Sequence, residues 1–127
     1  GRPAKDRGGR KAETTAAAKW SEEGDYEKVK DALLEAGSKP DASSDTLKLL
    51  AYSEIRLGEY ENAEKRFEAV VEKDPSDHTS LYYLAWLYAQ KGELAKAEQS
   101  VERALAEKPD EEMYKALRDE IKKKTAR

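Results

Sequence analysis

The side chains that could carry chemistry are few in this 127-residue chain, and their spacing does not build a catalytic site. His78 is the only histidine and cysteine is absent, which excludes a thiol nucleophile, a thiolate metal site and a cluster of histidine ligands. A solvated helix face does not separate two carboxyl pKa values, as paired acid–base catalysis requires. We therefore predict no catalytic residues, no metal site and no cofactor. The carboxylates on such a polar face, at helical spacing, are Glu59, Glu61, Glu64 and Glu68.

Composition favours one soluble helical domain. Charged residues make up 40% of the chain, and glycine and proline are few, which is typical of long solvent-exposed helices. The longest apolar run, residues 81–89, is shorter than the roughly 20 residues of a membrane-spanning helix. We expect a soluble protein, cytoplasmic rather than periplasmic, with no membrane partner. Because the chain begins with Gly1 and not with methionine, the sequence is compatible with removal of a leader, a tag or a neighbouring domain.

Basic residues gather at both ends of the chain, although its formal net charge is −3. They are frequent in residues 1–11 and again in residues 122–127. Such ends could engage phosphates, but short charged tails are more often solvated, and the acidic remainder repels DNA. We expect no nucleic-acid partner. Residues 1–11 lack apolar periodicity, so we expect a disordered basic arm.

A repeat with a period of 34 residues organises the rest of the sequence. Gly24, Gly58 and Gly92 recur at this spacing, and the apolar residues around them recur with them. A fixed period of this length indicates a repeated helical hairpin. The matched columns are Ala16, Leu50 and Leu84; Ala17, Ala51 and Ala85; Tyr26, Tyr60 and Leu94; Val29, Ala63 and Ala97; Leu33, Phe67 and Val101; and Ala36, Val70 and Ala104.

Apolar periodicity and capping residues predict about seven helices. Ser43, Ser44 and Asp45 are candidate N-caps for the third helix, and Asp110 is a candidate N-cap for the last. Gly37 is expected to end the second helix in a left-handed conformation. The predicted helices cover residues 12–23, 26–36, 44–57, 60–74, 79–90, 94–105 and 111–124.

This pattern resembles the tetratricopeptide repeat. Each unit has small residues in its first helix, a glycine turn, an alanine and an aromatic residue in its second helix, and a closing proline, here Pro75 and Pro109. The resemblance implies an all-α, right-handed α-solenoid of helix-turn-helix hairpins. Glu54 departs from the pattern, because the family usually has an aromatic residue there, as at Trp20 and Tyr88. The implied domain covers residues 12–127, with units at about 10–43, 44–77 and 78–111 and a capping helix at about 111–124.

The resemblance also implies a function. Tetratricopeptide arrays act as scaffolds whose concave groove takes an extended peptide or a helix. We therefore predict a non-enzymatic interaction scaffold with a protein or peptide partner. The helix over residues 79–90 is apolar nearly all round, and an array leaves one of its faces uncovered. The residues implied to line the groove are Lys48, Tyr52, Arg56, Tyr82, Tyr83, Trp86 and Gln90.

One subset of the family binds the terminal carboxylate of heat-shock chaperones through a clamp of two lysines, two asparagines and an arginine. The matching positions here hold none of these clamp residues, so we do not expect that mechanism. They hold Thr14, Ala18, Leu49, Thr79 and Tyr83.

Three alternatives remain open at this point. The aromatic residues Tyr82, Tyr83 and Trp86 could pack under the final helix, or against a second copy in a homodimer. In the second case the chain is a homo-oligomerisation module. The chain could also be the tetratricopeptide module of a larger enzyme or of a secretion or assembly component.

Overall fold

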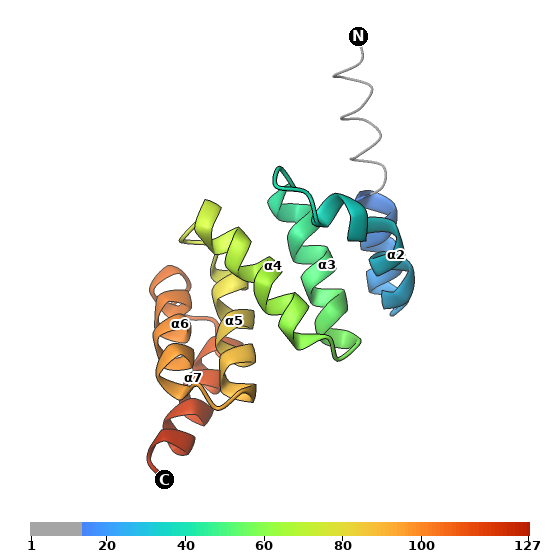
Figure 1. Cartoon of the computed structure of the whole chain (residues 1–127). Helices are drawn as coiled ribbons and strands as arrows, with labels where there is room; N and C mark the ends of the chain where they lie inside the picture. The colour runs from blue at the N-terminus through green and yellow to red at the C-terminus, as the bar shows by residue number, and fades with distance from the viewer. Residues whose placement is uncertain (1–13) are drawn as a thin grey trace. The chain divides into compact units, whose positions relative to one another are not determined.

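The structure is a computed structural model that describes residues 14–127, and these residues form seven helices joined by short turns. The prediction of an all-α fold is confirmed. The basic arm predicted over residues 1–11 lies outside the described residues. Figure 1 shows an unlabelled helix over residues 14–22, followed by α2 (Tyr26–Gly37), α3 (Ser44–Arg56), α4 (Tyr60–Lys73), α5 (His78–Gln90), α6 (Leu94–Glu107) and α7 (Glu112–Thr125).

The described helices pack as two compact units, residues 14–66 and residues 67–127, and the division falls inside α4. In the first unit α2 packs against α3. In the second unit α6 packs against both α5 and α7, and α7 also reaches α5. Apart from α5 with α7, these pairs join helices that follow one another in the chain, as a repeated hairpin requires.

The predicted glycine turns have the expected backbone, but Gly37 does not. Gly24, Gly58 and Gly92 have φ values of 80°, 81° and 83°, where side-chain-bearing residues are strained. α2 instead runs through Gly37, whose φ is not positive, so the predicted left-handed end there was wrong. The physical reason for glycine is close packing, because a Cβ at Gly37 would collide with the side chain of Leu50.

Gly37→Ala should destabilise the protein by about 1–3 kcal/mol, because the added methyl group overpacks the contact with Leu50. This cost exceeds the roughly 1 kcal/mol by which alanine is favoured over glycine inside a helix. Denaturant unfolding measures the change. In Gly37→Ala/Leu50→Ala the collision is relieved, so the double variant should lose less than the sum of the single variants. A gain in stability for Gly37→Ala alone would contradict the packing argument.

Helices of the first unit share one hydrophobic cluster. Ala17, Val29, Leu33 and Leu50 are all at most 1% exposed and touch one another. All four are column positions of the 34-residue repeat, so the sequence pattern identified this core. Val29 and Leu33 lie on α2 and Leu50 lies on α3, so their burial fixes which faces of these two helices meet.

A buried ion pair replaces the aromatic residue that the family pattern has at Glu54. The Glu54 side chain is fully buried, and Arg66 donates from Nε and Nη2 to its two carboxylate oxygens at 3.1 and 3.2 Å. Arg66 Nη1 also donates to the carbonyl of Gly37 at 3.4 Å. A bidentate pair of this kind compensates much of the cost of removing two charges from water.

Arg66→Ala should destabilise the protein by about 3–5 kcal/mol, because it leaves the Glu54 carboxylate buried without its cation. The double variant Glu54→Tyr/Arg66→Leu removes both charges and should recover most of that loss. Lys65→Ala is the matched control, since it removes an exposed cation from the same helix and should change stability by less than about 0.5 kcal/mol. Chemical denaturation of the three variants tests the pair, and equal losses for Arg66→Ala and Lys65→Ala would refute it.

In the second unit the last helix completes the core. Leu81, Ala104, Leu105 and Tyr114 form a buried cluster, and Tyr82 packs against it. Tyr114 comes from α7, so this helix contributes side chains to the core and does more than shield it from solvent. The capping role that the resemblance implied for this helix is therefore only part of its function in the fold.

The predicted helix caps were right for one helix and wrong for another. The side chain of Ser43 accepts a hydrogen bond from the Thr46 amide at 3.2 Å, as expected for the N-cap of α3. In α7, however, the residue at the N-cap is Glu111, and its side chain makes no capping hydrogen bond. Asp110 lies one residue too early in the chain, in the turn after Pro109.

Candidate partner-binding surfaces

α5 is buried around most of its circumference, and its remaining accessible side chains are mainly aromatic. Tyr82, Tyr83 and Trp86 are half-buried, and Gln90 is exposed. Tyr82, Trp86 and Gln90 follow one another at intervals of four residues, which places them along one face of the helix. We call Tyr82, Tyr83, Trp86 and Gln90 the α5 surface. The buried residues of the same helix are Ser80, Leu81, Leu84, Ala85, Leu87, Tyr88 and Ala89.

Two tyrosines of the α5 surface belong to a continuous series of aromatic contacts. Tyr83 stacks on the buried ring of Phe67, with ring centroids 5.2 Å apart and an interplanar angle of 16°. Tyr82 contacts the edge of Tyr83 at 5.2 Å and stacks on Tyr114 at 4.9 Å. These contacts hold the tyrosine rings in place before any partner binds. They also show that α7 covers part of Tyr82, which was one of the alternatives left open by the sequence.

Tyr114 is held in turn by the start of α5. Its hydroxyl group lies 2.7 Å from Nδ1 of His78, a hydrogen-bonding distance. Burial raises the pKa of Tyr114, and it also raises the pKa of Tyr82, to which the nearby carboxylates of Glu120 and Glu111 add. In both cases the folded protein favours the neutral phenol.

These raised pKa values predict a loss of stability at high pH. The contribution of a neutral phenol is complete below the ordinary tyrosine pKa of 10.0 and is lost as the pH rises through the higher folded value. The free energy of unfolding should therefore fall above about pH 10, and less steeply in Tyr82→Phe. Met113→Leu, at an exposed residue without an ionisable group, is the control and should keep the wild-type slope. Urea denaturation at a series of pH values tests this, and identical slopes in both variants would argue against it.

The remaining predicted residues lie on α3, in the first unit. Lys48, Tyr52 and Arg56 also follow at intervals of four, so they share one face, which we call the α3 surface. Tyr52 meets Tyr26 of α2 edge-on, with ring centroids 5.8 Å apart. The guanidinium carbon of Arg56 lies 5.3 Å from the ring centroid of Tyr26, in a cation–π contact. Burial is the main cause that raises the pKa of Tyr52, and a hydrogen bond with Tyr26 raises it further.

The structure thus gathers the predicted residues into two sets, three on α3 in the first unit and four on α5 in the second. Sequence reasoning missed their supporting residues, Tyr26, Phe67 and Tyr114. Tyr26 and Phe67 were named only as members of repeat columns, and Tyr26 is half-buried beside the α3 surface. Tyr114 lies beyond the third repeat unit, so it belongs to no repeat column from which its contacts could be inferred.

Carboxylates that the sequence placed on a solvated face have specific partners. Glu59 accepts a hydrogen bond from Lys30 Nζ at 2.6 Å, and this bond raises the pKa of Lys30. Glu68 accepts a hydrogen bond from the Tyr88 hydroxyl at 2.8 Å. The first contact ties α2 to the residue that precedes α4, and the second ties α4 to α5, each within one unit. Glu68 on the polar face of α4 therefore contributes to packing.

Metal-binding geometry is not found in the described part of the chain. Across residues 14–127 no three His, Asp or Glu side chains come together as a metal ion would require. Over the same residues, every helix is too short or too polar to pass through a bilayer.

The fold and the two surfaces define a helical repeat protein, and the chain belongs to the tetratricopeptide repeat family. The sequence model of the family described as "Tetratricopeptide repeat" matches residues 48–112, about half of the chain. This match begins in α3 and ends at the first residue of α7, so it includes most of α3 and the whole of α4, α5 and α6.

Solved structures of tetratricopeptide proteins share this fold. The type III secretion chaperone SycD of Yersinia enterocolitica, in complex with a peptide of the translocator YopD, superposes with a TM-score of 0.79 at 19% identity, over 91% of this chain and 93% of that chain. The first tetratricopeptide domain of Spaghetti (RPAP3), bound to an HSP90 peptide, gives a TM-score of 0.84 at 16% identity, over 91% and 92% of the two chains. At these identities the likeness establishes the fold.

A closer sequence relative is a much longer protein. Rhomboid protease GluP of Bacillus subtilis (strain 168) is 47% identical over 75 residues, which are 59% of this chain and 15% of GluP. The matching region is therefore a small part of that protein.

Proposed function

We propose that the chain is a non-enzymatic protein-interaction module that binds an extended or helical segment of a partner protein. The α5 surface carries this proposal. Tyr82, Tyr83 and Trp86 keep accessible aromatic area on a helix that is otherwise buried. Aromatic residues with accessible area are enriched at protein interfaces and often dominate their binding energy.

The neighbouring contacts support binding at low entropic cost. On the α5 surface, Tyr83 is held against Phe67 before a partner arrives. A partner segment bound there loses conformational freedom, while the side chains that receive it lose little. Its aromatic rings suit aliphatic or proline side chains. The α3 surface of the first unit is a separate candidate, where Lys48 and Arg56, the latter held against Tyr26, suit acidic side chains.

The comparisons support a peptide partner in general terms. Related structures in the family contain peptides of a translocator and of heat-shock chaperones. The chaperone clamp is not proposed here, because Leu49, Thr79 and Tyr83 stand where the clamp has charged or amide side chains. We propose a different peptide motif, recognised through the aromatic residues.

Selection from a peptide library tests the proposal. Peptides retained by the wild type should be lost by Tyr83→Ala/Trp86→Ala, and Trp86→Ala alone should weaken a selected peptide by about 2 kcal/mol. Tyr60→Ala, which removes an exposed aromatic residue elsewhere, is the control. Tyr52→Ala/Arg56→Ala tests the α3 surface separately. Circular dichroism must show that each variant is folded.

Equal enrichment by the wild type and by Tyr83→Ala/Trp86→Ala would refute the α5 surface as the binding site. A lower melting temperature of Trp86→Ala with unchanged binding would assign Trp86 to the core. Light scattering at several concentrations examines the homodimer alternative, and a stable dimer abolished by Trp86→Ala would replace the peptide proposal.

The GluP relationship favours a second proposal, that this module is part of a larger protein that resembles a rhomboid protease. Identity of 47% over 75 residues is the observation that favours it. The module would then bring partner segments to the rest of that protein. Sequencing the complete coding frame tests this, and a frame with no rhomboid-like segment would refute it.

A further inference from the structure

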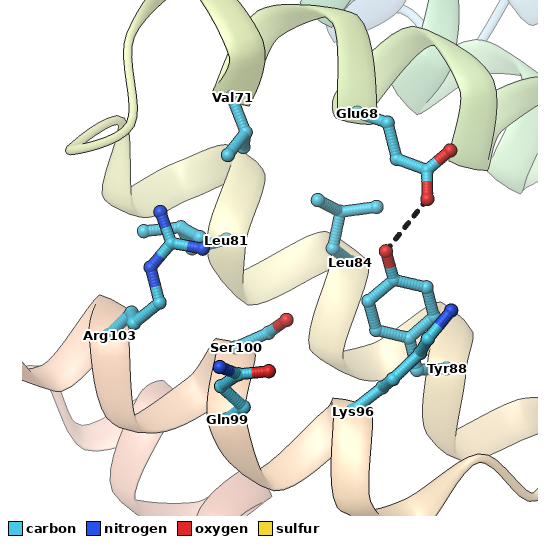
Figure 2. Close-up of a pocket in the computed structure, with 9 residues that line it drawn as sticks. All are labelled: Glu68, Val71, Leu81, Leu84, Tyr88, Lys96, Gln99, Ser100 and Arg103. Atoms are coloured by element: carbon cyan, nitrogen blue, oxygen red, sulfur yellow. Dashed lines mark hydrogen bonds between the residues drawn. The ribbon is translucent and has the colours of Figure 1, made fainter.

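A cavity of about 270 Å³ lies within the second unit, between α4, α5 and α6. Figure 2 shows Val71 and Glu68 on the α4 side of it, and Arg103, Ser100, Gln99 and Lys96 on the α6 side. Leu81 and Leu84 of α5, together with Val71, give it an apolar floor. It is open to solvent, and its polar groups lie around an aliphatic centre, as in many ligand sites.

This cavity is on the opposite side of α5 from the α5 surface. Its α5 residues, Leu81, Leu84 and Tyr88, recur at intervals of three and four residues, so they lie on one face. At 3.6 residues per turn, Tyr82 and Trp86 point about half a turn away from that face. The cavity is therefore separate from the binding surface proposed above.

Sequence explains why the cavity exists. The residue that lies 34 positions before Ser100 is Arg66, and the residue 34 positions before Tyr88 is Glu54. In the first unit the Arg66 side chain reaches Glu54 and the Gly37 carbonyl. Ser100 is too small to fill the corresponding space in the second unit. The cavity in the second unit therefore corresponds to the space that the Arg66 side chain fills in the first unit.

The polar groups at the cavity favour an anionic ligand. Arg103 is exposed and donates from Nη2 to the Pro75 carbonyl at 3.0 Å, and across residues 14–127 it forms no ion pair with a carboxylate. Lys96 adds a second positive charge, although it is 3.5 Å from the Glu93 carboxylate. On the opposite wall, Glu68 already accepts a hydrogen bond from Tyr88. A guanidinium group with donors to spare is a strong, directional partner for a carboxylate.

We propose that this cavity binds an acidic peptide segment of a partner protein, with an aliphatic side chain on the floor of Val71, Leu81 and Leu84 and a neighbouring carboxylate on Arg103. The aliphatic side chain displaces water from an apolar floor, and the carboxylate sets the orientation of the segment. Ser100 and Gln99 also line the cavity, and their side chains can hydrogen-bond the peptide backbone.

Methyl NMR of the full chain, titrated with the capped peptide acetyl-Ser-Leu-Glu-Leu-Ser-amide, tests this proposal. Saturable shifts of the Val71, Leu81 and Leu84 methyl resonances are expected, and acetyl-Ser-Leu-Lys-Leu-Ser-amide should produce none. Arg103→Gln should raise the dissociation constant about tenfold, because a charge-assisted hydrogen bond is lost. Lys123→Gln, which removes one exposed positive charge from α7, should leave it unchanged. Ser100→Arg, which restores the side chain found in the first unit, should fill the cavity and abolish the shifts.

Each contrary result is decisive. No methyl shifts, equal shifts with the lysine peptide, or an unchanged dissociation constant in Arg103→Gln would overturn the proposal. Methyl shifts that follow protein concentration without peptide would assign the cavity to a second copy of the chain. Tyr83→Ala/Trp86→Ala should still bind the glutamate peptide, so failure of the α5 surface and failure of this cavity give different results.

Discussion

Close approach of paired helices is the constraint on which the rest of this structure depends. Ala51 and Ala63 in the first unit, and Ala85 and Ala97 in the second, have no exposed surface. Small side chains at these positions let helix backbones approach, and left-handed glycines such as Gly92 turn the chain back tightly enough to allow it. Larger apolar residues then fill the remaining volume. Because the two helices of every hairpin must approach closely, small residues and turn glycines recur at the same positions in each repeat.

Helix order and the main core could be predicted from the sequence because they repeat with it. The glycine turns and the Ser43 cap follow local rules, and Val29, Leu33 and Leu50 were identified by their columns. Gly37 was misassigned because its requirement is the distant Leu50 side chain, which no local pattern reveals. The same limit explains why the stacking of Tyr82 on Tyr114 was left open, since α7 lies outside the repeat.

The candidate surfaces show what residue types at helical spacing can and cannot predict. The family resemblance implied Lys48, Tyr52 and Arg56, and also Tyr82, Trp86 and Gln90; in the structure each set recurs every four residues along one helix face. The supporting contacts could not be read this way, because Phe67 and Tyr26 resemble ordinary core positions. The cavity beside Ser100 was also missed, since its residues were read one by one as parts of polar or apolar helix faces. Comparison of one repeat with the next would have exposed it.

The ion pair of Glu54 and Arg66 has a consequence for how the chain finds its fold. Repeat proteins with similar hairpins can misfold when a helix of one repeat packs against the equivalent helix of another repeat. Glu54 meets a guanidinium group only when α3 pairs with α4; at the equivalent place on α6 it would face Ser100 and be buried without a cation. A frame-shifted arrangement would therefore carry an uncompensated buried charge. The ion pair therefore distinguishes the α3–α4 hairpin from the other hairpins, whereas the glycine and alanine columns are common to all of them.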